Sequence, residues 1–400
     1  MSSRPQGAAA PSDGARGVGA PHSLSLLTTP DGWDDPGLRR RWEELSASSD
    51  NVNSLYASPV WFDLLRRGPD GGRLALAVAY DGDGAVAGLA PVLFKGHPFQ
   101  YYVGRHPVYT SELKAAHVLG STPMLPEAAA SYEQLVGALL KSGADCVYMD
   151  TVPVESFCWR QAQELGRKDF LVYAPGGPRA WHLLRLPGDP EAYLSGMSSK
   201  TRYTLRKKAK QLAERGGGQL EMVRVESEEQ VASFLADAVS VSRKTWQHSN
   251  LGKRIGDSEE ERAWYAGLAR AGVLRGYILR CGERPCAFVV GYQHNGVFHD
   301  VELGYDPDFK ENSPGTVLLH MLIQDLCSHR PAALLNFGLG DADYKGRFGN
   351  VRTEDVSVLV MRKSLLNRLR VGSHASFRTL VRSARDVVRR VQSARSSRKG

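Results

Sequence analysis

The same order of secondary-structure elements is predicted twice in this chain, and this repetition constrains the fold more than any other feature. In each half a tight-turn signal, Asp81-Gly82-Asp83-Gly84 or Asn295-Gly296, separates two apolar runs that indicate an antiparallel hairpin. A helical pattern and a further strand follow each hairpin. The predicted elements are 74–80, 85–94, 128–141 and 146–150 in the first half, and 286–294, 297–305, 314–328 and 334–337 in the second. This order predicts an α/β (mixed α+β) protein whose sheets are mixed and mostly antiparallel.

The length of 400 residues favours two domains, because a single core rarely grows so large. No apolar stretch approaches 18 residues, so we expect no membrane-spanning helix. Residues 1–22 are rich in Ser, Ala, Gly, Pro and Arg and have no hydrophobic segment, which predicts a disordered leader. The predicted domains are 23–186 and 187–363, and a tail follows at 364–400.

The five cysteines show no metal-ligand spacing, and none has a base placed to make a Cys–His nucleophile. They are Cys146, Cys158, Cys281, Cys286 and Cys327. We therefore expect no metal site, no covalent acyl-enzyme and a reducing, cytoplasmic location.

The stretch at 305–326 predicts a helix whose first turn holds Ser313, Gly315 and Thr316. Free backbone N–H groups and the positive end of the helix dipole make such a start suitable for an anion. Gly315 would let a phosphate approach the backbone closely. The alternative is structural, with Ser313 capping a helix that faces the core.

The stretch at 197–212 predicts a helix on which Arg202, Arg206 and Lys210 recur at intervals of four and share one face. Such cations repel one another unless solvent or an anion neutralises them. A solvated face is one interpretation. Phosphate or substrate binding is the other, because the run lies at the predicted junction between the halves, where ligand clefts tend to form.

These stretches, taken with 337–348 ("FGLGDADYKGRF"), resemble the Fem-related branch of the GNAT acyltransferases. The resemblance covers about residues 185–365 in the family's order and spacing, and extends more weakly to the first half. It implies tandem GNAT-like domains with the active cleft in or against the second domain. The acyl donor would lie with its phosphates at the helix that starts near Pro314. The common GNAT pyrophosphate loop is missing, so both acyl-CoA and aminoacyl-tRNA stay open as donors.

Acyl transfer to an amine needs a base, a polarised carbonyl and a protonated leaving group. On the predicted strand 297–305, alternation places Asp300 and Glu302 on one face and His299 and Tyr305 on the other. Two acids on one face raise each other's pKa, which suits a general base. The alternative is that both acids face solvent on a half-exposed strand.

The stretch at 336–349 predicts a glycine-loosened loop after a buried strand. Lys345 is a candidate for stabilising an oxyanion or binding an acceptor phosphate, and Tyr344 for protonating the leaving group. Arg347 suits a bidentate grip on a carboxylate or phosphate, and Asp341 is a further substrate-binding candidate. The alternative is a surface turn in which an acid pairs with Lys345, a contact of about 0–1 kcal/mol.

The stretch at 97–110 is unusually aromatic and polar for a connection, which makes Tyr102 and Arg105 candidates for lining the acceptor pocket. An aromatic surface loop packed on the sheet is the alternative.

The net charge of +8 is concentrated in the tail, because residues 362–400 hold twelve Lys or Arg against one acid. Phe377, Leu380, Val381 and Val387 fall on one side of a predicted helix and arginines on the other. This basic amphipathic helix docks on the body, lies on an anionic membrane or contacts tRNA; no DNA partner is expected.

The resulting interpretation is a cytoplasmic N-acyltransferase without a tightly bound cofactor, which becomes membrane-peripheral if the tail lies on an anionic membrane. It would transfer an acetyl-like group from acyl-CoA to an amine of a small molecule, sugar or peptide. The alternatives are aminoacyl transfer from charged tRNA and a non-catalytic GNAT-like binding module.

Overall fold

The computed structural model describes residues 23–68, 71–245, 255–340 and 342–396, so the predicted leader at 1–22 lies outside the described residues. The strands are β1 (Ser23–Leu27), β2 (Arg73–Tyr80), β3 (Val86–Val103), β4 (His106–Val118), β5 (Cys146–Pro153), β6 (Phe170–Tyr173), β7 (Arg179–Arg185), β8 (Leu220–Val225), β9 (Gly276–Cys281), β10 (Arg284–His294), β11 (Val297–Tyr305), β12 (Leu334–Leu339) and β13 (Val351–Arg362). The helices are α1 (Pro30–Trp33), α2 (Pro36–Ala47), η1 (Ser54–Ala57), α3 (Pro59–Arg67), α4 (Ala129–Lys141), α5 (Phe157–Arg167), α6 (Pro190–Ser195), α7 (Ser199–Arg215), α8 (Glu228–Ser242), α10 (Glu259–Arg270), η2 (Pro307–Asn312), α11 (Pro314–Ser328), α12 (Asp343–Phe348) and α13 (Leu365–Ser396).

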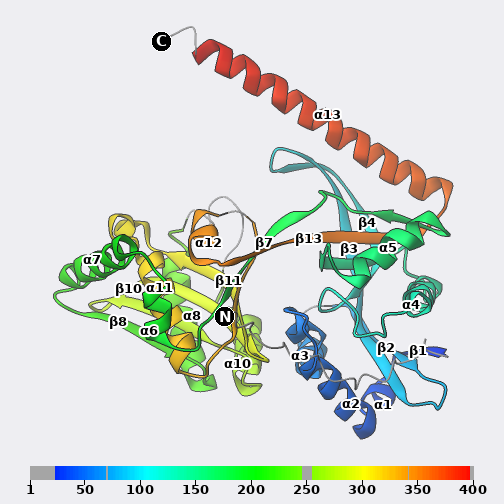
Figure 1. Cartoon of the computed structure of the whole chain (residues 1–400), viewed down its shortest axis with the longest axis horizontal. Coiled ribbons are helices and arrows are strands. Elements are labelled where there is room, and N and C mark those ends of the chain that lie inside the picture. The colour runs from blue at the N-terminus through cyan, green and yellow to red at the C-terminus, as the bar shows by residue number, and fades with distance from the viewer. Residues whose placement is uncertain (1–22, 69–70, 246–254, 341, 397–400) are drawn as a thin grey trace, which may run out of the picture.

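One sheet runs through the whole molecule in the order β1-β2-β3-β4-β5-β13-β7-β12-β11-β10-β9-β8, with β6 paired to β13 (Figure 1). Among the described strands, the pairs β4–β5 and β11–β12 are parallel and the other ladders are antiparallel. The predicted mixed, mostly antiparallel α/β architecture with a C-terminal helix is therefore confirmed.

The predicted repetition is visible in the two parallel pairs. In the first half β4 is followed by α4 and then by β5, and in the second half β11 is followed by α11 and then by β12. A helix between parallel neighbours is the usual crossover, because parallel strands cannot be joined by a tight turn.

The two halves are connected through the centre of the sheet by β7 and β13. β13 comes last in the sequence, yet it pairs with β5 and β6 of the first half and with β7. β7 in turn pairs with β12 of the second half. This arrangement brings residues from both halves to the middle of the molecule.

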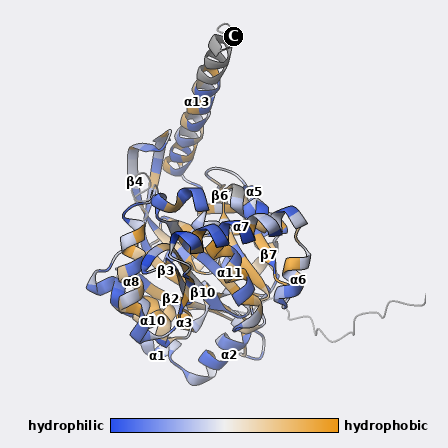
Figure 2. Cartoon of the chain, turned by 90° about the vertical axis from the view of Figure 1, so that its left-hand side faces the viewer, coloured by the Kyte–Doolittle hydropathy of each residue, from blue (hydrophilic) through white to orange (hydrophobic). Residues whose placement is uncertain are grey.

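Helices cover both faces of the second half's strands. Val317, Leu318 and Leu322 of α11 belong to one buried cluster, and Phe234 of α8 and Leu268 of α10 belong to the cluster on the opposite face. Figure 2 shows the apolar segments of α11 and β10 inside the body, whereas much of α13 is hydrophilic and projects from it.

Two predicted loops are regular elements instead. Residues 97–110 form the end of β3, a turn at Gly104 with φ of +65°, and the start of β4, so the predicted connection is wrong. Residues 343–348, predicted as part of a loop, form helix α12, which begins after Gly338 and Gly340. The strands β1, β4 and β6 were not predicted.

The first half of α13 docks on the β3–β4 hairpin and its remainder extends away from the body (Figure 1). Nε2 of His374 lies 3.0 Å from the carbonyl oxygen of Gln100, and the hydroxyl of Ser373 lies 2.8 Å from that of Tyr101. Phe377 packs edge-on against Tyr101 with ring centroids 5.3 Å apart. Docking therefore involves Phe377, whereas Leu380, predicted on the same stripe, is exposed.

Candidate functional site

The strands β11 and β12 separate part-way along their length and leave an opening between them. They pair in parallel from Val297 with Leu334 to His299 with Asn336, and no further. Beyond that point β11 continues to Tyr305, while β12 continues to Leu339 alongside β7. The side chains at the start of this opening form the candidate site.

A β-bulge at Val301 places the side chains of Asp300 and Glu302 on opposite faces of the sheet. Asp300 pairs with Gly291 and Glu302 pairs with Val290, so Val301 is the extra residue in β11. Directly paired residues share a face, and Gly291 and Val290 lie on opposite faces of β10. The prediction that both carboxylates share one face is therefore wrong, because the bulge shifts the alternation by one residue.

Asp300 is the acid at the opening. Its Oδ1 is buried, and within the described residues it has no hydrogen-bond partner. Burial raises the pKa of Asp300 to about 7, against the lowering effect of Lys345, with a smaller rise from Glu302. A carboxyl group with this pKa exchanges its proton near neutral pH, as a general base must.

Helix α12 places Tyr344 and Lys345 beside Asp300. Nζ of Lys345 donates to the carbonyl oxygen of Leu339 at 2.5 Å, and the ring of Tyr344 packs edge-on against Phe337. Burial raises the pKa of the Tyr344 hydroxyl well above its usual value, and the nearby Asp300 adds to the rise. Tyr344 therefore stays protonated at neutral pH.

Two further candidates of this motif are Arg347 and Asp341. Arg347 is exposed near the end of α12. Asp341 lies outside the described residues. Three of the five predicted residues of this region, counting Asp300, thus come together.

A cavity of about 190 Å³, here called the α11 cavity, lies at the start of α11 beside β11. Its lining comprises Leu303, Tyr305, Lys310, Ser313, Gly315, Thr316, Leu319 and Tyr344. The three residues predicted to bind the donor are thus on its wall together with Tyr344.

The backbone at the start of α11 shows what Ser313 and Gly315 do in the fold. Ser313 has a left-handed backbone with φ of +51° and makes no side-chain cap, so the capping interpretation is wrong. A Cβ on Gly315 would lie 3.2 Å from Cδ2 of Leu303 and 3.4 Å from Cδ1 of Tyr305. The glycine therefore serves close packing of α11 on β11.

No described residue of the basic helix α7 lines the α11 cavity or the larger cavity described next. Arg202 donates to the carbonyl oxygens of Leu194 and Met197, so it joins α6 to α7. Arg206 is exposed, and Lys210 is an exposed cation 3.9 Å from Glu214. The side chains of Arg206 and Lys210 thus lie on a solvated face, whereas Arg202 is bound to backbone carbonyls.

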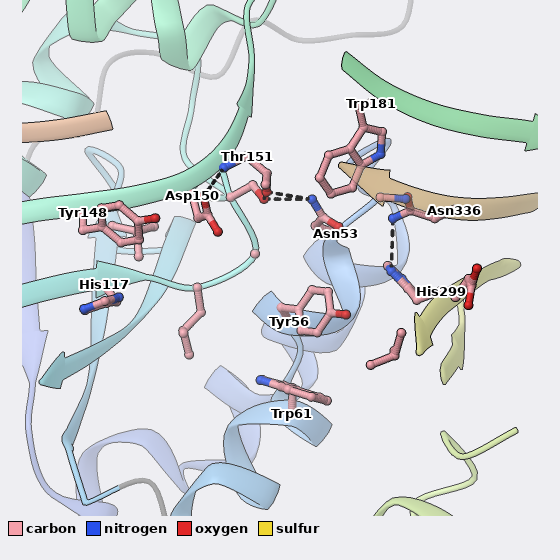
Figure 3. Close-up of a pocket in the computed structure, with 17 residues that line it drawn as sticks. Asn53, Tyr56, Trp61, His117, Tyr148, Asp150, Thr151, Trp181, His299 and Asn336 are labelled. Atoms are coloured by element: carbon pink, nitrogen blue, oxygen red, sulfur yellow. Dashed lines mark hydrogen bonds between the residues drawn. The ribbon is translucent and has the colours of Figure 1, made fainter. Parts of the chain in front are cut away.

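A second cavity of about 460 Å³, here called the central cavity, lies where the two halves meet (Figure 3). In Figure 3, His117, Tyr148 and Asp150 come from the first half, and His299 and Asn336 face them from the second. The lining comprises Asn53, Tyr56, Trp61, His117, Val118, Leu119, Gly120, Ser121, Tyr148, Asp150, Thr151, Trp181, His299, Asp300, Val301, Asn336 and Gly338. Asp300 thus borders this cavity, while its electrostatic partner Tyr344 borders the α11 cavity.

The two histidines of the central cavity are neutral at pH 7. Burial lowers the pKa of His299 to about 4, with a further lowering from His294. Burial lowers the pKa of His117 to about 4 as well, helped by His97. The charged side chains of the described lining are the carboxyl groups of Asp150 and Asp300, and no lysine or arginine is among these residues.

The first half contains the equivalent opening, but polar side chains fill it. β4 and β5 pair in parallel up to Val118 and Met149. Beyond this point Nδ2 of Asn53 donates to Oγ of Ser121 at 2.8 Å, and the hydroxyls of Ser121 and Thr151 lie 2.6 Å apart. These hydrogen-bonded side chains form the first-half wall of the central cavity, and the opening between β11 and β12 forms the facing wall.

The structure places Tyr102 and Arg105 away from the central cavity. Tyr102 is near the tip of the β3–β4 hairpin, where its hydroxyl donates to Oε1 of Gln100 at 2.5 Å. Arg105 lies in the turn itself. Neither belongs to the lining of the central cavity.

Sequence reasoning missed most of the central cavity. Asn53, Tyr56 and Trp181 stand in stretches without a motif. Asn53 reaches the cavity through its hydrogen bonds to Ser121 and Thr151, Tyr56 packs edge-on against His299, and Trp181 lies on β7. Asn336 lies in the motif that was singled out, where a polar residue inside a buried strand was the available signal.

Within the described residues, no group of three or more His, Cys, Asp or Glu side chains is arranged to hold a metal ion. No helix in the described ranges combines the length and apolar character needed to cross a bilayer. The five cysteines are all buried and unbonded.

Residues 199–346 match the family model described as an acetyltransferase (GNAT) domain. The fold is similar to that of FemX, with a TM-score of 0.60 and 11% identity over 82% of this chain and 97% of that chain. It is also similar to a conserved protein of unknown function from Bacteroides thetaiotaomicron VPI-5482, with a TM-score of 0.51 and 11% identity over 85% and 100% of the two chains. No curated protein matches this sequence. At these identities the structural likeness concerns the fold alone.

Proposed function

The chain carries a GNAT acyltransferase domain at residues 199–346, and from this premise we propose that it transfers an acyl group from an acyl-CoA to an amine. The family match confirms the resemblance drawn from the sequence. The observation that carries the proposal is the position of Asp300, which borders the central cavity and interacts electrostatically with Tyr344 on the wall of the α11 cavity.

The α11 cavity is the proposed donor site. It lies at the first turn of a fifteen-residue helix, where backbone N–H groups and the helix dipole favour phosphate. Ser313 and Thr316 add hydroxyl groups to the same wall. The acyl thioester would then point along β11 towards Asp300.

The central cavity is the proposed acceptor site. Its carboxyl groups and the faces of Tyr56, Trp61 and Trp181 favour a cationic amine, and the part of the lining that the structure describes has no lysine or arginine to repel it. The cavity is large enough for a small molecule, an amino sugar or the end of a peptide.

The proposed reaction needs no covalent enzyme intermediate. The carboxylate of Asp300 takes a proton from the acceptor ammonium, and the amine nitrogen attacks the thioester carbonyl carbon. The positive charge of Lys345 stabilises the oxyanion that forms. The carbon–sulfur bond then breaks, and the departing thiolate takes the proton of the Tyr344 hydroxyl. The Tyr344 phenolate in turn takes the extra proton that the attacking nitrogen still carries, which leaves the neutral amide and restores the hydroxyl.

The test uses the full chain with radiolabelled acetyl-CoA and a panel of amines, amino sugars and peptides. We expect label to appear in at least one acceptor, and Asp300→Asn to remove it while coenzyme A still binds. Absence of both transfer and coenzyme A binding would end the acyl-CoA proposal.

The second candidate is aminoacyl transfer from charged tRNA, and the basic helix α13 favours it. Phosphate contacts by arginines would make tRNA binding fall steeply with salt. Binding to tRNA that is lost on truncation after Lys363, together with transfer from aminoacyl-tRNA, would select this candidate over acyl-CoA.

A third candidate is a non-catalytic module that binds an anionic membrane through α13. Leu365, Leu366 and Leu369 are exposed on this helix beside Arg362 and Arg368, as an interfacial helix requires. A cytoplasmic, membrane-peripheral location would suit this contact. Vesicle binding that persists in Asp300→Asn, with no transfer to any acceptor, would favour the module.

A further inference from the structure

A third cavity lies between α13 and the β3–β4 hairpin, and its lining is rich in arginine. It has a volume of about 530 Å³ and is here called the arginine cavity. Arg179 from β7 and Arg378, Arg382 and Arg385 from α13 contribute to its wall. The described lining contains no aspartate or glutamate.

Clustered arginines elsewhere in this fold meet carboxylates. Arg224 and Arg275 share Asp325, and Arg39 and Arg66 share Asp34. In the arginine cavity, no described carboxylate lies within salt-bridge distance of an arginine.

The closest equivalent in the cavity is a neutral contact, since Arg179 donates to the hydroxyl of Ser357 at 2.9 Å. Asp150 accepts from the same Ser357 hydroxyl and, with Glu112, acts on His97, and Asp355 lies opposite Arg179 on β13. Because none of these carboxylates forms an ion pair with an arginine of the cavity, the guanidinium groups repel one another and an anion that enters is stabilised by them.

Helix α13, which carries three of the four arginines, is hydrogen-bonded to the body through His374. His374 lies on α13 between the hairpin and β6: its Nε2 contacts the carbonyl oxygen of Gln100, and its Nδ1 lies 2.5 Å from the hydroxyl of Tyr173. Gly176 has φ of +104°, and a Cβ there would lie 3.6 Å from Nη1 of Arg378. The part of α13 up to Arg378 is therefore fixed against the body, and Arg382 and Arg385 follow on the same helix with exposed side chains.

We propose that the arginine cavity binds a phosphate group, carried either by a free phosphorylated compound or by a phospholipid headgroup. Guanidinium groups bind phosphate oxygens through paired hydrogen bonds, and a cavity open to solvent admits the rest of the ligand. This site is separate from the proposed acyl-transfer centre and does not depend on that function.

The test is isothermal titration calorimetry of the full chain with two probes. Inorganic pyrophosphate represents the free compound, and monomeric dihexanoyl phosphatidic acid represents the headgroup. We expect at least one probe to bind, with an affinity that falls as salt rises. The probe that binds more tightly identifies the source of the phosphate.

Two double variants of equal charge change locate the site. Arg382→Gln with Arg385→Gln removes two exposed cations from the cavity, and Lys363→Gln with Arg368→Gln removes two exposed cations outside it. We expect the first pair to weaken binding about tenfold or more and the second to change it less than about twofold. Binding of neither probe, or equal weakening by both pairs, would overturn the proposal. Circular dichroism verifies that both variants retain the fold.

Discussion

Nδ2 of Asn336 lies 3.2 Å from Nδ1 of His299, at the last residue pair that joins β11 to β12. The amide oxygen of Asn336 accepts from the backbone N–H of Gly338 at 2.9 Å, which orients its NH₂ group towards the ring. Nδ1 of His299 is then the acceptor, and the neutral ring carries its proton on Nε2. This contact fixes the point at which the two strands separate.

Replacing Asn336 by alanine should destabilise the fold by about 1 to 3 kcal/mol, because two buried polar groups lose their partner. Urea unfolding of Asn336→Ala, His299→Phe and the double variant measures the coupling between the two side chains. We expect a coupling energy of about 1 kcal/mol. Additive effects of the two changes would show that the contact does not stabilise the opening.

The base assignment predicts a specific pH profile. Since the pKa of Asp300 is raised to about 7, the acyl-transfer rate should rise as pH increases through about 7 and then level off. Asp300→Asn should lower kcat about 100-fold or more and remove this dependence. The rate of transfer to a fixed acceptor between pH 5.5 and 9 measures both effects.

Glu302→Gln is the matched control, because Glu302 lies on the opposite face of β11. We expect this variant to keep the pH profile of the wild type. If Glu302→Gln instead loses activity and Asp300→Asn retains it, the general base is Glu302 and not Asp300.

The raised pKa of Asp300 also affects stability. An acid with a folded-state pKa above its unfolded value favours the fold below the unfolded pKa, near 4, and loses that contribution as pH rises through 7. Asp300→Asn should therefore raise the free energy of unfolding at pH 8 by about 4 kcal/mol and leave it nearly unchanged at pH 4. Urea titrations at the two pH values test this, and equal effects at both would contradict it.

Elements with strong end signals were predicted with their observed bounds. The turn Asn295-Gly296 and the start at Ser313-Pro314 set the limits of β11 and α11, which match the prediction residue for residue. β4 was missed, because Pro107, Glu112 and Lys114 interrupt the apolar pattern of a strand that runs out along an exposed hairpin.

The candidate site was predictable only in part. Asp300, Tyr344 and Lys345 lie in motifs whose residue types indicate acid–base chemistry, and the fold brings them together. No residue type near Val301 indicates a bulge, so the sequence could not predict that Asp300 and Glu302 lie on opposite faces of β11. The central cavity depends on pairing between β7, β12 and β13, which single-sequence patterns do not encode.

The donor assignment predicts that Gly315→Ala impairs acyl-CoA binding. The added Cβ would lie 3.2 Å from Leu303 on the wall of the α11 cavity and would force α11 or that wall to shift. We expect KM for acetyl-CoA to rise about tenfold, with a smaller change in kcat. Gly137→Ala in α4, where a Cβ meets nothing within 4 Å, should leave KM unchanged and stabilise the fold by about 1 kcal/mol. An unaltered KM in Gly315→Ala would place the donor elsewhere.

The exposed leucines of α13 allow a test of whether this helix binds an anionic bilayer or tRNA. The side chains of Leu366 and Leu369 are 65% and 61% exposed, so replacing both by serine should cost little folding stability. If α13 lies on an anionic bilayer, the double variant loses buried apolar area and should bind phosphatidylglycerol vesicles about tenfold more weakly in a sedimentation assay. Tyr203→Ser, at a 67% exposed position on α7, is the control for loss of an exposed apolar side chain. If α13 instead contacts tRNA, its arginines carry the affinity, and the leucine variant binds tRNA as the wild type does.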